Sequence, residues 1–378
     1  MNHRPFVAAY YFPNWHCDPR IEELHGKGWN EWRVVQHATP RFPGHRQPKV
    51  PLWGYLDESK PEVMALKITA AVNHGIDAFI FDWYSFNDGT YRERCLNDGF
   101  LKAANSQDIK FAMMWCNHNP MYAHPGSYWK PAEINWIGDD ITPETFRIEC
   151  DIYIEKYFSR PNYLRVDGGL YFSIFRPQRM IESLGGDAAA AELFREFRNK
   201  VKAAGLGELN LNAKCDNYDK SDNAYAQYEA RMKQAGFDSI SEYTWDLLGD
   251  GFPELEAETW TQNNQALRQR KCQEFKGVYY PSVSTGWDSS PRTVQSDMYE
   301  CRGYPFCPIV VNFTPDRFEA ALEHWKQEYN NKVFKGNMLL LACWNEWTEG
   351  AYLEPDTDYG YAYLQAVKNV FGTGKQER

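Results

Sequence analysis

Glu346 and Glu349 stand three positions apart near the end of the sequence, directly after an apolar run at residues 339–343. The run is short enough to be a buried strand, and Gly350 then turns the chain. Two carboxylates of differing pKa can supply the acid and the base that cleave a glycosidic bond. Residues 344–353 are rich in Trp and Tyr, whose flat rings stack on sugars. The segment indicates a sugar-cleaving site, although a strand end with solvated glutamates and a core aromatic cluster would have the same pattern.

Composition favours a globular protein with aromatic residues in a surface groove, where they could stack on a ligand such as carbohydrate. Aromatic residues make up 16% of the 378 positions, including 14 Trp and 24 Tyr, which is more than a core requires. A formal net charge of -10 argues against nucleic acid or an anionic membrane as the main partner. Nine scattered cysteines are an odd count and no disulfide framework, and the absence of Cys-x-x-Cys argues against structural zinc. We therefore expect no metal and no cofactor.

The elements that must position the glutamates alternate regularly along the chain. Apolar, β-branched and aromatic runs predict eight strands, at residues 7–12, 78–84, 110–116, 170–175, 209–214, 239–243, 277–283 and 339–343. Helical spacing and capping signals predict a helix after each strand, at residues 58–73, 91–104, 142–157, 187–204, 225–235, 255–275, from 314 onward, and 359–371.

Eight strand and helix pairs predict a parallel (β/α)8 TIM barrel with extended βα loops, formed by residues 1–378 as a single domain. A doubly wound open sheet is the alternative, but no Gly-x-Gly-x-x-Gly follows any strand. The first strand begins by residue 6, which leaves no room for a signal peptide. We expect a cytoplasmic protein if Met1 is native, and a periplasmic or secreted one if a leader has been removed.

In a barrel, active-site groups come from the carboxyl ends of the strands. These ends carry aromatic rings, carboxylates and a few cations, which suits a polyhydroxylated ligand, although a structural role remains open for each residue alone. The candidates for substrate binding are Tyr10, Tyr11, Asp82, Trp83, Trp115, Asn117, Arg176, Lys214, Asp216, Glu242, Tyr243, Trp287, Asp288 and Asn345.

Three other kinds of barrel enzyme fit less well. A metal-dependent hydrolase would place histidine pairs at strand ends, whereas His16, His45, His118 and His124 fall in loops. A phosphate-binding barrel would have glycine-rich loops after its last two strands. Nucleophilic Ser or Cys chemistry would need a paired histidine, which no pattern marks.

Motifs at both ends of the chain carry a family resemblance. Residues 10–13 (YYFP), 28–32 (GWNEW) and 43–48 (PGHRQP), together with 344–350 (WNEWTEG) and 352–356 (YLEPD), resemble the WbsX-like proteins, which are related to glycoside hydrolase family 99. The resemblance implies a (β/α)8 barrel. Characterised family 99 members are retaining endo-α-mannosidases or endo-mannanases, whereas the WbsX-like group carries a glycosyltransferase label. Trp29 and Trp347 lie inside these motifs and join the candidates for substrate binding.

The resemblance also implies roles for the two glutamates. Glu346 would deprotonate the substrate 2-hydroxyl, which attacks the anomeric carbon to give a 1,2-anhydro sugar, and Glu349 would protonate the leaving oxygen and then activate water. An intramolecular attack of this kind gains a large effective molarity. The predicted fourth and seventh strand ends offer no glutamate, which favours this arrangement. Residues 116–120 depart from the WbsX-like pattern, so mannose specificity is not carried over.

The sequence therefore predicts a retaining glycoside hydrolase whose partner is a carbohydrate substrate, a polysaccharide or glycan. Two alternatives remain. A glycosyltransferase of surface polysaccharide synthesis would need groups that hold a diphosphate, and the strands are followed by no glycine-rich phosphate loop. A non-catalytic carbohydrate-binding barrel would need the aromatic residues but neither glutamate.

Overall fold

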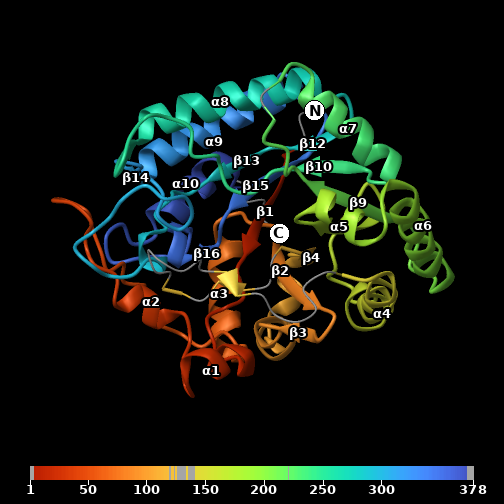
Figure 1. Ribbon diagram of the computed structural model, residues 1–378, viewed down its shortest axis with the longest axis horizontal. Helices are drawn as coiled ribbons and strands as arrows, with labels where there is room; N and C mark the ends of the chain where they lie inside the picture. Colours follow the sequence, from red (N-terminus) through yellow and green to blue (C-terminus); the bar gives the residue numbers. More distant parts are fainter. Residues whose placement is uncertain are drawn as a thin grey trace, which may run out of the picture.

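The computed structural model describes residues 4–118, 121–122, 124–125, 133–134, 141–219 and 221–372. Its main sheet runs through the middle of the molecule and is built from strands that pair in parallel (Figure 1). In chain order these are β1 (Phe6–Tyr11), β2 (Ala78–Phe86), β4 (Lys110–Trp115), β8 (Gly169–Ile174), β9 (Leu209–Lys214), β10 (Ser239–Ser241), β12 (Val278–Tyr280), β13 (Ser282–Ser284) and β15 (Met338–Ala342).

The segment predicted as the seventh strand, which forms β12 and β13, closes the sheet into a barrel. β12 pairs with β10 and β13 pairs with β15, so the two ends of the sheet meet in one segment, residues 278–284. Pro281 separates the two halves, because proline has no N–H to donate to a ladder. The predicted (β/α)8 barrel is confirmed, and the open doubly wound sheet is excluded.

Helices cover the outside of the barrel (Figure 1). They are α3 (Pro61–Asn73), α4 (Pro143–Tyr153), α6 (Asp187–Ala203), α7 (Ala224–Ala235), α8 (Ala257–Glu274), α9 (Pro315–Asn330) and α10 (Ala362–Phe371). Local chemistry fixes several of their ends. Thr142, for example, accepts a hydrogen bond from the Thr145 N–H at 3.1 Å and caps α4, as its Thr-Pro sequence predicts.

One predicted helix is wrong in kind. Residues 91–104 form a wide turn, η1 (Cys95–Gly99), and a tight one, η2 (Phe100–Lys102), in place of a regular α-helix. A Cβ at Gly99 would lie 2.0 Å from the Glu58 carbonyl oxygen. The loop that contains Glu58 therefore packs closely on this segment. Helical spacing in the sequence does not reveal such a contact, nor the irregular turns that accompany it.

The remaining helices and strands are shorter. They are α1 (Pro19–His25), α2 (Trp32–Gln36), β3 (Gly89–Tyr91), η3 (Ser106–Asp108), β5 (Met121–Tyr122), β6 (Glu133–Ile134), η4 (Ile154–Phe158), β7 (Arg165–Val166), α5 (Pro177–Ser183), β11 (Glu254–Glu256), η5 (Ser290–Arg292), β14 (Ile309–Val311), β16 (Asn345–Glu346), η6 (Trp347–Glu349) and β17 (Ala351–Tyr352).

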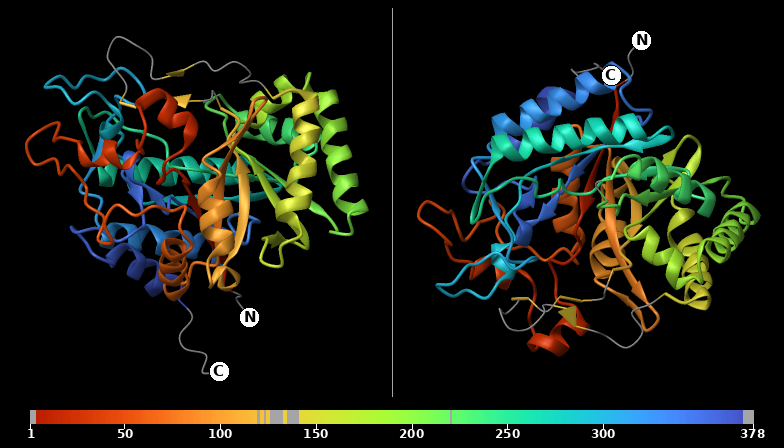
Figure 2. Two further views of the ribbon diagram at one scale, coloured as in Figure 1. Left: turned by 90° about the horizontal axis from the view of Figure 1, so that it is seen from below. Right: turned by 45° about the horizontal axis from the view of Figure 1, so that its top comes forward.

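Two long loops stand over the same end of the barrel. The loop before α3 (red to orange) and the loop after β13 (light blue) lie side by side in every view (Figure 2). Contacts between them include the Thr39 N–H, which donates to Gln295 Oε1 at 2.8 Å, and Arg41, which donates to the Val294 carbonyl at 3.0 Å. This end of the barrel is therefore covered by two segments that lie about 250 residues apart in the sequence.

Neither a membrane-spanning helix nor a disulfide is part of this architecture in the described ranges. None of the helices there is both long and apolar enough to cross a bilayer. All nine cysteines lie within those ranges, and each has a free thiol.

Candidate active site

The turn after β15 delivers the two glutamates. Asn345 is fully buried and clamps the turn to the first strand unit, because its Oδ1 accepts from the Phe12 N–H at 2.8 Å and its Nδ2 donates to the Phe12 carbonyl at 3.0 Å. Trp347 stacks on Tyr352 with ring centroids 3.7 Å apart. Glu346 points the other way, as expected for neighbours in an extended segment.

Glu346 and Glu349 line one cavity of about 340 Å³ at the carboxyl ends of the strands, which we call the main cavity. This volume lies near the lower end of the range for small-molecule sites, roughly 300–1,000 Å³. The other lining residues are Phe12, Asp82, Tyr84, Tyr91, Arg92, Cys116, His118, His124, Phe175, Arg176, Tyr218, Tyr243, Thr244, Trp287, Arg292 and Tyr304.

Arg292 joins the two glutamates. One terminal nitrogen of its guanidinium donates to Glu346 Oε1 at 2.7 Å, and the other donates to Glu349 Oε1 at 2.5 Å. Tyr304 also donates to Glu349 Oε1, at 2.9 Å. The arginine lies in η5, in the long loop after β13, where no periodic signal marks it. The one available signal was indirect, because two buried carboxylates need a cation close by.

Glu31 completes the charge cluster from the loop after β1. Its Oε1 accepts from Arg292 at 3.2 Å and from the Thr348 hydroxyl at 2.6 Å. Burial by itself would raise the pKa of Glu31, but the charges of Arg292 and Arg92 hold it below its ordinary value. Glu31 is therefore ionised at neutral pH, and its negative charge balances part of the positive charge of Arg292.

Burial raises the pKa of Glu346 well above its ordinary value, and the neighbouring charge of Glu349 adds to this effect. Two buried carboxylates that share one guanidinium hold a proton between them more readily than either would alone. Glu349 Oε1 accepts from Arg292 and Tyr304. Within the described ranges, its other oxygen, Oε2, makes no hydrogen bond.

Asp82 and Glu346 share the hydroxyl of Tyr243, which lies 3.0 Å from Asp82 Oδ2 and 3.1 Å from Glu346 Oε2. A phenol has one hydrogen, so Tyr243 donates to one of these carboxyls and accepts from the other, which must then be protonated. Burial raises the pKa of Asp82 to about 8 and keeps Tyr243 un-ionised by raising its pKa as well. Burial raises the pKa of Glu346 too, so at neutral pH the Tyr243 hydroxyl lies between two carboxyls that both favour the protonated form.

Aromatic rings and a second arginine also line the main cavity. The Arg92 guanidinium lies 4.7 Å from the Tyr84 ring centre, 4.9 Å from that of Tyr91 and 5.0 Å from that of Phe12. His124 is buried there too. Burial, followed by the charge of Arg292, lowers its pKa to about 3, so the imidazole is neutral at physiological pH.

The structure brings four predicted substrate-binding residues into the main cavity beside the glutamates: Asp82, Arg176, Tyr243 and Trp287. Lys214 and Glu242 line a smaller cavity of about 110 Å³, which shares Phe175, Tyr218, Tyr243 and Thr244 with the main one. There Lys214 Nζ lies 4.3 Å from the Phe175 ring centre, and Glu242 pairs with Lys271 at 2.7 Å.

Other candidates line neither cavity, because successive strand residues face opposite sides of the sheet. Tyr11 points outward and donates to Glu58 Oε1 at 2.7 Å. Trp83 packs on Tyr157, and Trp115 stacks on Phe146 with centroids 5.9 Å apart. All three side chains are buried between the barrel and its surroundings, away from both cavities.

The remaining candidates hold the site together from behind. Tyr10 points into the barrel and donates to the Glu242 carbonyl at 2.7 Å. Asn117 exchanges hydrogen bonds with the Arg176 backbone at 2.8 and 2.9 Å, which fixes two neighbouring strand ends. Asn345 and Trp347 anchor the turn described above. Trp29 lies in the loop after β1, where it stacks on His25 with centroids 4.3 Å apart.

Asp216 and Asp288 also fall outside the lining of the main cavity. Gln178 donates to Asp216 Oδ1 at 3.2 Å, and Asp288 pairs with His45 at 2.8 Å. Within the described ranges, no group of three or more His, Cys, Asp or Glu side chains is placed to hold a metal ion.

Sequence signals for the residues that were missed differ in strength. Phe12 and Glu31 lie inside the motifs at residues 10–13 and 28–32, which were noticed but not assigned to the site. Arg92, His124 and Tyr304 lie at the end of none of the eight predicted strands, and only the tertiary structure brings them to the glutamates.

Comparison with solved structures shows what this fold resembles. A structure described as a glycoside hydrolase-like protein aligns with a TM-score of 0.60 and 16% identity, covering 99% of this chain and 96% of the other. The GH99 endo-alpha-mannosidase from Bacteroides thetaiotaomicron, solved in complex with BIS-TRIS-propane, aligns with a TM-score of 0.56 and 15% identity, covering 96% and 95%. At these identities the likeness is one of fold.

Sequence comparison reaches further along one family. The uncharacterized protein WxcX of Xanthomonas campestris pv. campestris (strain B100) is 27% identical over 392 residues, which cover 96% of this chain and 49% of that protein. The chain thus spans about half the length of the curated relatives it matches. The family model described as glycosyltransferase WbsX matches residues 7–367, and this chain belongs to that family.

Proposed function

We propose that this chain is a retaining glycoside hydrolase that cleaves a polysaccharide or glycan, with Glu346 and Glu349 as its acid and base. The observation that carries the proposal is the pair of buried carboxylates held on the two terminal nitrogens of Arg292, at the wall of an aromatic-lined cavity. Hydrolysis of an acetal needs one group that donates a proton to the leaving oxygen and another that accepts a proton from the nucleophile.

The proposed reaction uses the substrate 2-hydroxyl as nucleophile. Ionised Glu346 takes the hydroxyl proton while O2 attacks the anomeric carbon, and Glu349 gives its proton to the departing glycosidic oxygen. The product of this step is a 1,2-anhydro sugar. Glu349 then takes a proton from water while the water oxygen attacks the anomeric carbon. The bond from that carbon to O2 breaks, and Glu346 returns its proton to O2. Two inversions at one carbon give retention of configuration.

The hydrogen bonds in the site support these roles. The Tyr243 donation to Glu346 stabilises the ionised base, while Arg292 and Tyr304 occupy one oxygen of Glu349 and leave Oε2 for the acid proton. Arg292 also neutralises charge that passes from one carboxylate to the other as the proton moves, without any rearrangement of the site.

Substitution of each glutamate tests the proposal once a substrate has been found by screening polysaccharides. We expect Glu346→Gln and Glu349→Gln each to abolish turnover while each variant remains folded, as circular dichroism would show. Glu155→Gln, an exposed carboxylate on η4, is the matched control and should retain activity. Full activity in either glutamate variant would refute the assignment.

A second experiment tests participation of the 2-hydroxyl. Early products analysed by NMR should have the anomeric configuration of the substrate, and an analogue that lacks the 2-hydroxyl should bind without being cleaved. A covalent sugar adduct on Glu346 or Glu349, detected by mass spectrometry after incubation with a 2-fluoro analogue, would instead show a carboxylate nucleophile.

The family description supports a second candidate, a glycosyltransferase of surface polysaccharide synthesis. Asp356 and Asp358 form an Asp-x-Asp sequence, whose carboxylates could hold a metal-bound diphosphate. Both are engaged within the protein, however, since Asp356 accepts from the Tyr352 hydroxyl at 2.8 Å and Asp358 pairs with Lys49 at 2.9 Å. Thermal stabilisation by a nucleotide diphosphate sugar with Mn²⁺, lost in Asp358→Asn, would favour this candidate over hydrolysis.

A further inference from the structure

Arg92 is a buried cation of the main cavity whose N–H groups have no acceptor in the described ranges. The residue is 8% exposed, and its Nε is buried without a hydrogen-bond partner. One terminal nitrogen lies 4.0 Å from Glu31 Oε2, beyond hydrogen-bond distance, and the one hydrogen bond that Arg92 donates comes from its backbone. A guanidinium carries five N–H groups, and each one that is buried without an acceptor destabilises the protein. The contacts within the described ranges thus leave Arg92 short of acceptors.

A cage of three aromatic rings holds the guanidinium of Arg92 in place. It consists of the rings of Phe12, Tyr84 and Tyr91 described above. Tyr84 and Tyr91 pair across the hairpin of β2 and β3, with ring centroids 5.0 Å apart. The backbone is fixed as well, because the Arg92 N–H donates to Asp18 Oδ2 at 2.8 Å. Rings attract the charge of a guanidinium but accept no hydrogen bond in its plane, so the cage orients Arg92 without satisfying it.

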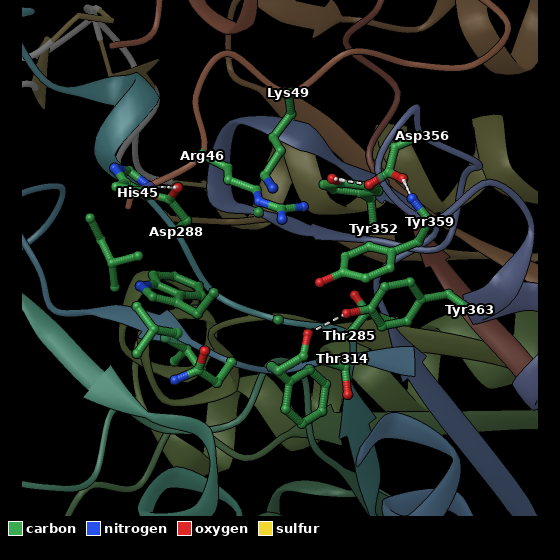
Figure 3. Close-up of a pocket in the computed structure, with 18 of the residues that line it drawn as sticks. His45, Arg46, Lys49, Thr285, Asp288, Thr314, Tyr352, Asp356, Tyr359 and Tyr363 are labelled. Atoms are coloured by element: carbon green, nitrogen blue, oxygen red, sulfur yellow. Dashed lines mark hydrogen bonds and ion pairs between the residues drawn. The ribbon is translucent and has the colours of Figure 1, made fainter. Parts of the chain in front are cut away.

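The carboxylates of a neighbouring cavity show the opposite situation. Trp287 lines both the main cavity and this second one, whose volume is about 350 Å³ (Figure 3). There Asp288 accepts from His45 at 2.8 Å, and Asp356 accepts from the Tyr352 hydroxyl at 2.8 Å. Groups that the protein itself satisfies give no sign of a ligand. The unsatisfied guanidinium in the main cavity does give such a sign, because buried polar groups in folded proteins are normally hydrogen-bonded.

The missing partner must offer acceptor oxygens in the plane of the guanidinium. A carboxylate can do so, and so can two neighbouring hydroxyls of a sugar, since the guanidinium donates two parallel hydrogen bonds. Charge decides between the two. Glu31 already faces Arg92, and Glu346 and Glu349 line the same cavity. An anion would add to this group of carboxyls, whereas a hydroxyl oxygen accepts a hydrogen bond without adding charge.

We propose that Arg92 is a substrate-binding residue, which donates to two neighbouring hydroxyl oxygens of a neutral sugar residue in the main cavity. The proposal rests on the proposed function in one respect, namely that this sugar belongs to the glycan cleaved over Glu346 and Glu349. Arg92 holds the sugar and transfers no proton, because a guanidinium stays charged in proteins. A sugar that lacks one of the two hydroxyls leaves a buried donor unpaired and is therefore rejected.

Calorimetric titration of the full chain with glucose, mannose and galactose tests the binding. We expect at least one of these hexoses to bind, and to bind more tightly than its uronic acid. Arg92→Met should weaken this binding by at least ~10-fold, the effect of losing hydrogen bonds from a charged donor. Arg92→Lys keeps the charge but not the two parallel donors, and its affinity should lie between the two. Arg147→Met, which removes an exposed arginine on α4, is the control and should bind as the wild type does.

Monodeoxy forms of the hexose that binds identify the contact. In the wild type, removal of either of two neighbouring hydroxyls should weaken binding by about 10-fold. In Arg92→Met the same removal should change the affinity little, because the partner of that hydroxyl is already gone.

Three results of these titrations would overturn the proposal. Equal losses for every deoxy sugar in the wild type and in Arg92→Met, with circular dichroism showing both folded, would leave Arg92 as a structural cation of its cage. Failure of all three hexoses to bind would rule out a neutral sugar as the ligand. Tighter binding of a uronic acid, lost in Arg92→Met, would show that Arg92 binds an anion instead.

Kinetics separate this proposal from the proposed function. On a polysaccharide that the protein cleaves, Arg92→Met should raise KM by at least ~10-fold with little change in kcat. An unchanged KM would contradict the contact between Arg92 and the sugar and leave the hydrolase in place. Binding of a hexose that depends on Arg92, without hydrolysis of any polysaccharide, would refute the hydrolase and leave Arg92 as assigned.

Discussion

Arg292 is the residue on which the charge balance of the site depends. Three carboxylates, Glu31, Glu346 and Glu349, accept from its guanidinium inside a buried cluster. Removing one partner of a buried ion pair leaves a charge that water can no longer stabilise, which is why such pairs are costly to break. The planar fork is also what aligns Glu346 and Glu349 on adjacent nitrogens, and a lysine cannot reproduce that geometry.

We therefore expect Arg292→Lys to lower kcat by roughly 100-fold, the usual cost of losing one pre-organised donor in an active site. The charge is retained, so thermal unfolding should change less than in Arg292→Met. Steady-state kinetics and differential scanning calorimetry measure the two effects, with Arg147→Lys as the surface control. Wild-type kcat in Arg292→Lys would show that the bidentate arrangement has no part in turnover.

The proposed role of Glu346 as the base requires a protonated Asp82, because the single hydrogen of the Tyr243 hydroxyl is then donated to Glu346. The pKa of Asp82 is raised to about 8, so activity should fall as the pH rises through about 8. In Asp82→Asn the amide can donate to the Tyr243 hydroxyl at any pH. We expect this variant to keep activity at a pH where the wild type loses it, as a pH profile of kcat would show.

The raised pKa of Asp82 also makes the free energy of unfolding depend on pH. The pKa of this carboxyl is about 3.9 in the unfolded chain and about 8 in the folded protein. Because the folded value is raised, its contribution to stability is present below about pH 4 and is lost as the pH rises to about 8. Denaturation of Asp82→Asn should lack this decline. A decline equal to that of the wild type would show that other groups cause it.

At the scale of elements, the segment from β15 to β17 is the part that turns a sequence motif into a site. Asn345 and Trp347 face inward and fix the turn, while Glu346 and Glu349 face the main cavity. Gly350 ends the turn with φ at 63°, in the left-handed region. A Cβ there would lie 2.7 Å from Asp288 Cβ and 2.8 Å from the Asp288 nitrogen, so the loop after β13 packs directly on it.

Gly350→Ala should therefore be costly for two reasons, backbone strain of roughly 1–2 kcal/mol and overlap with Asp288. Gly360→Ala is a matched control, because Gly360 has φ at 56° and nothing within 4 Å of the added Cβ. We expect chemical denaturation to show a larger loss in Gly350→Ala, together with lower activity. Equal losses in the two variants would mean that the contact with Asp288 yields without cost.

At the scale of the whole molecule, a buried ion cluster ties the first unit of the barrel to the last. Lys67 on α3 is 1% exposed and pairs with Glu58 and with Glu354, the latter at 2.6 Å. Asn345 donates to the same Glu58 at 2.9 Å, and both Trp344 and Trp347 donate to Glu354. The cluster lies behind the turn that carries Glu346 and Glu349, and it supports this turn from residues far away in the sequence.

Lys67→Met would leave two carboxylates buried without their cation. We expect the free energy of unfolding to fall by about 3–5 kcal/mol, the range for a broken buried pair. Lys102→Met, which removes an exposed i,i+4 pair with Asp98, should change it by less than about 0.5 kcal/mol. Urea denaturation measures both, and similar small losses would show that the buried carboxyls take up protons at little cost.

Strand periodicity made the barrel predictable from the sequence alone. The predicted strand at residues 209–214 agrees with β9 at both ends, and eight such strands in alternation with helices leave few topologies. The same periodicity made Glu346 and Glu349 predictable as one site, because Gly350 and the flanking aromatics mark a turn after a buried strand. These features are local, so the sequence alone determined them.

Only the tertiary structure decided which other side chains meet the glutamates. The rule that active-site residues lie at the carboxyl ends of strands does not distinguish the inward from the outward face of the sheet. Tyr11, Trp83 and Trp115 were therefore expected in the site, although their side chains are buried and line neither cavity. Arg292 and Tyr304 come from a long loop whose conformation has no period. Their place is set by contacts with residues 31, 348 and 349, and such contacts exist only once the barrel has closed.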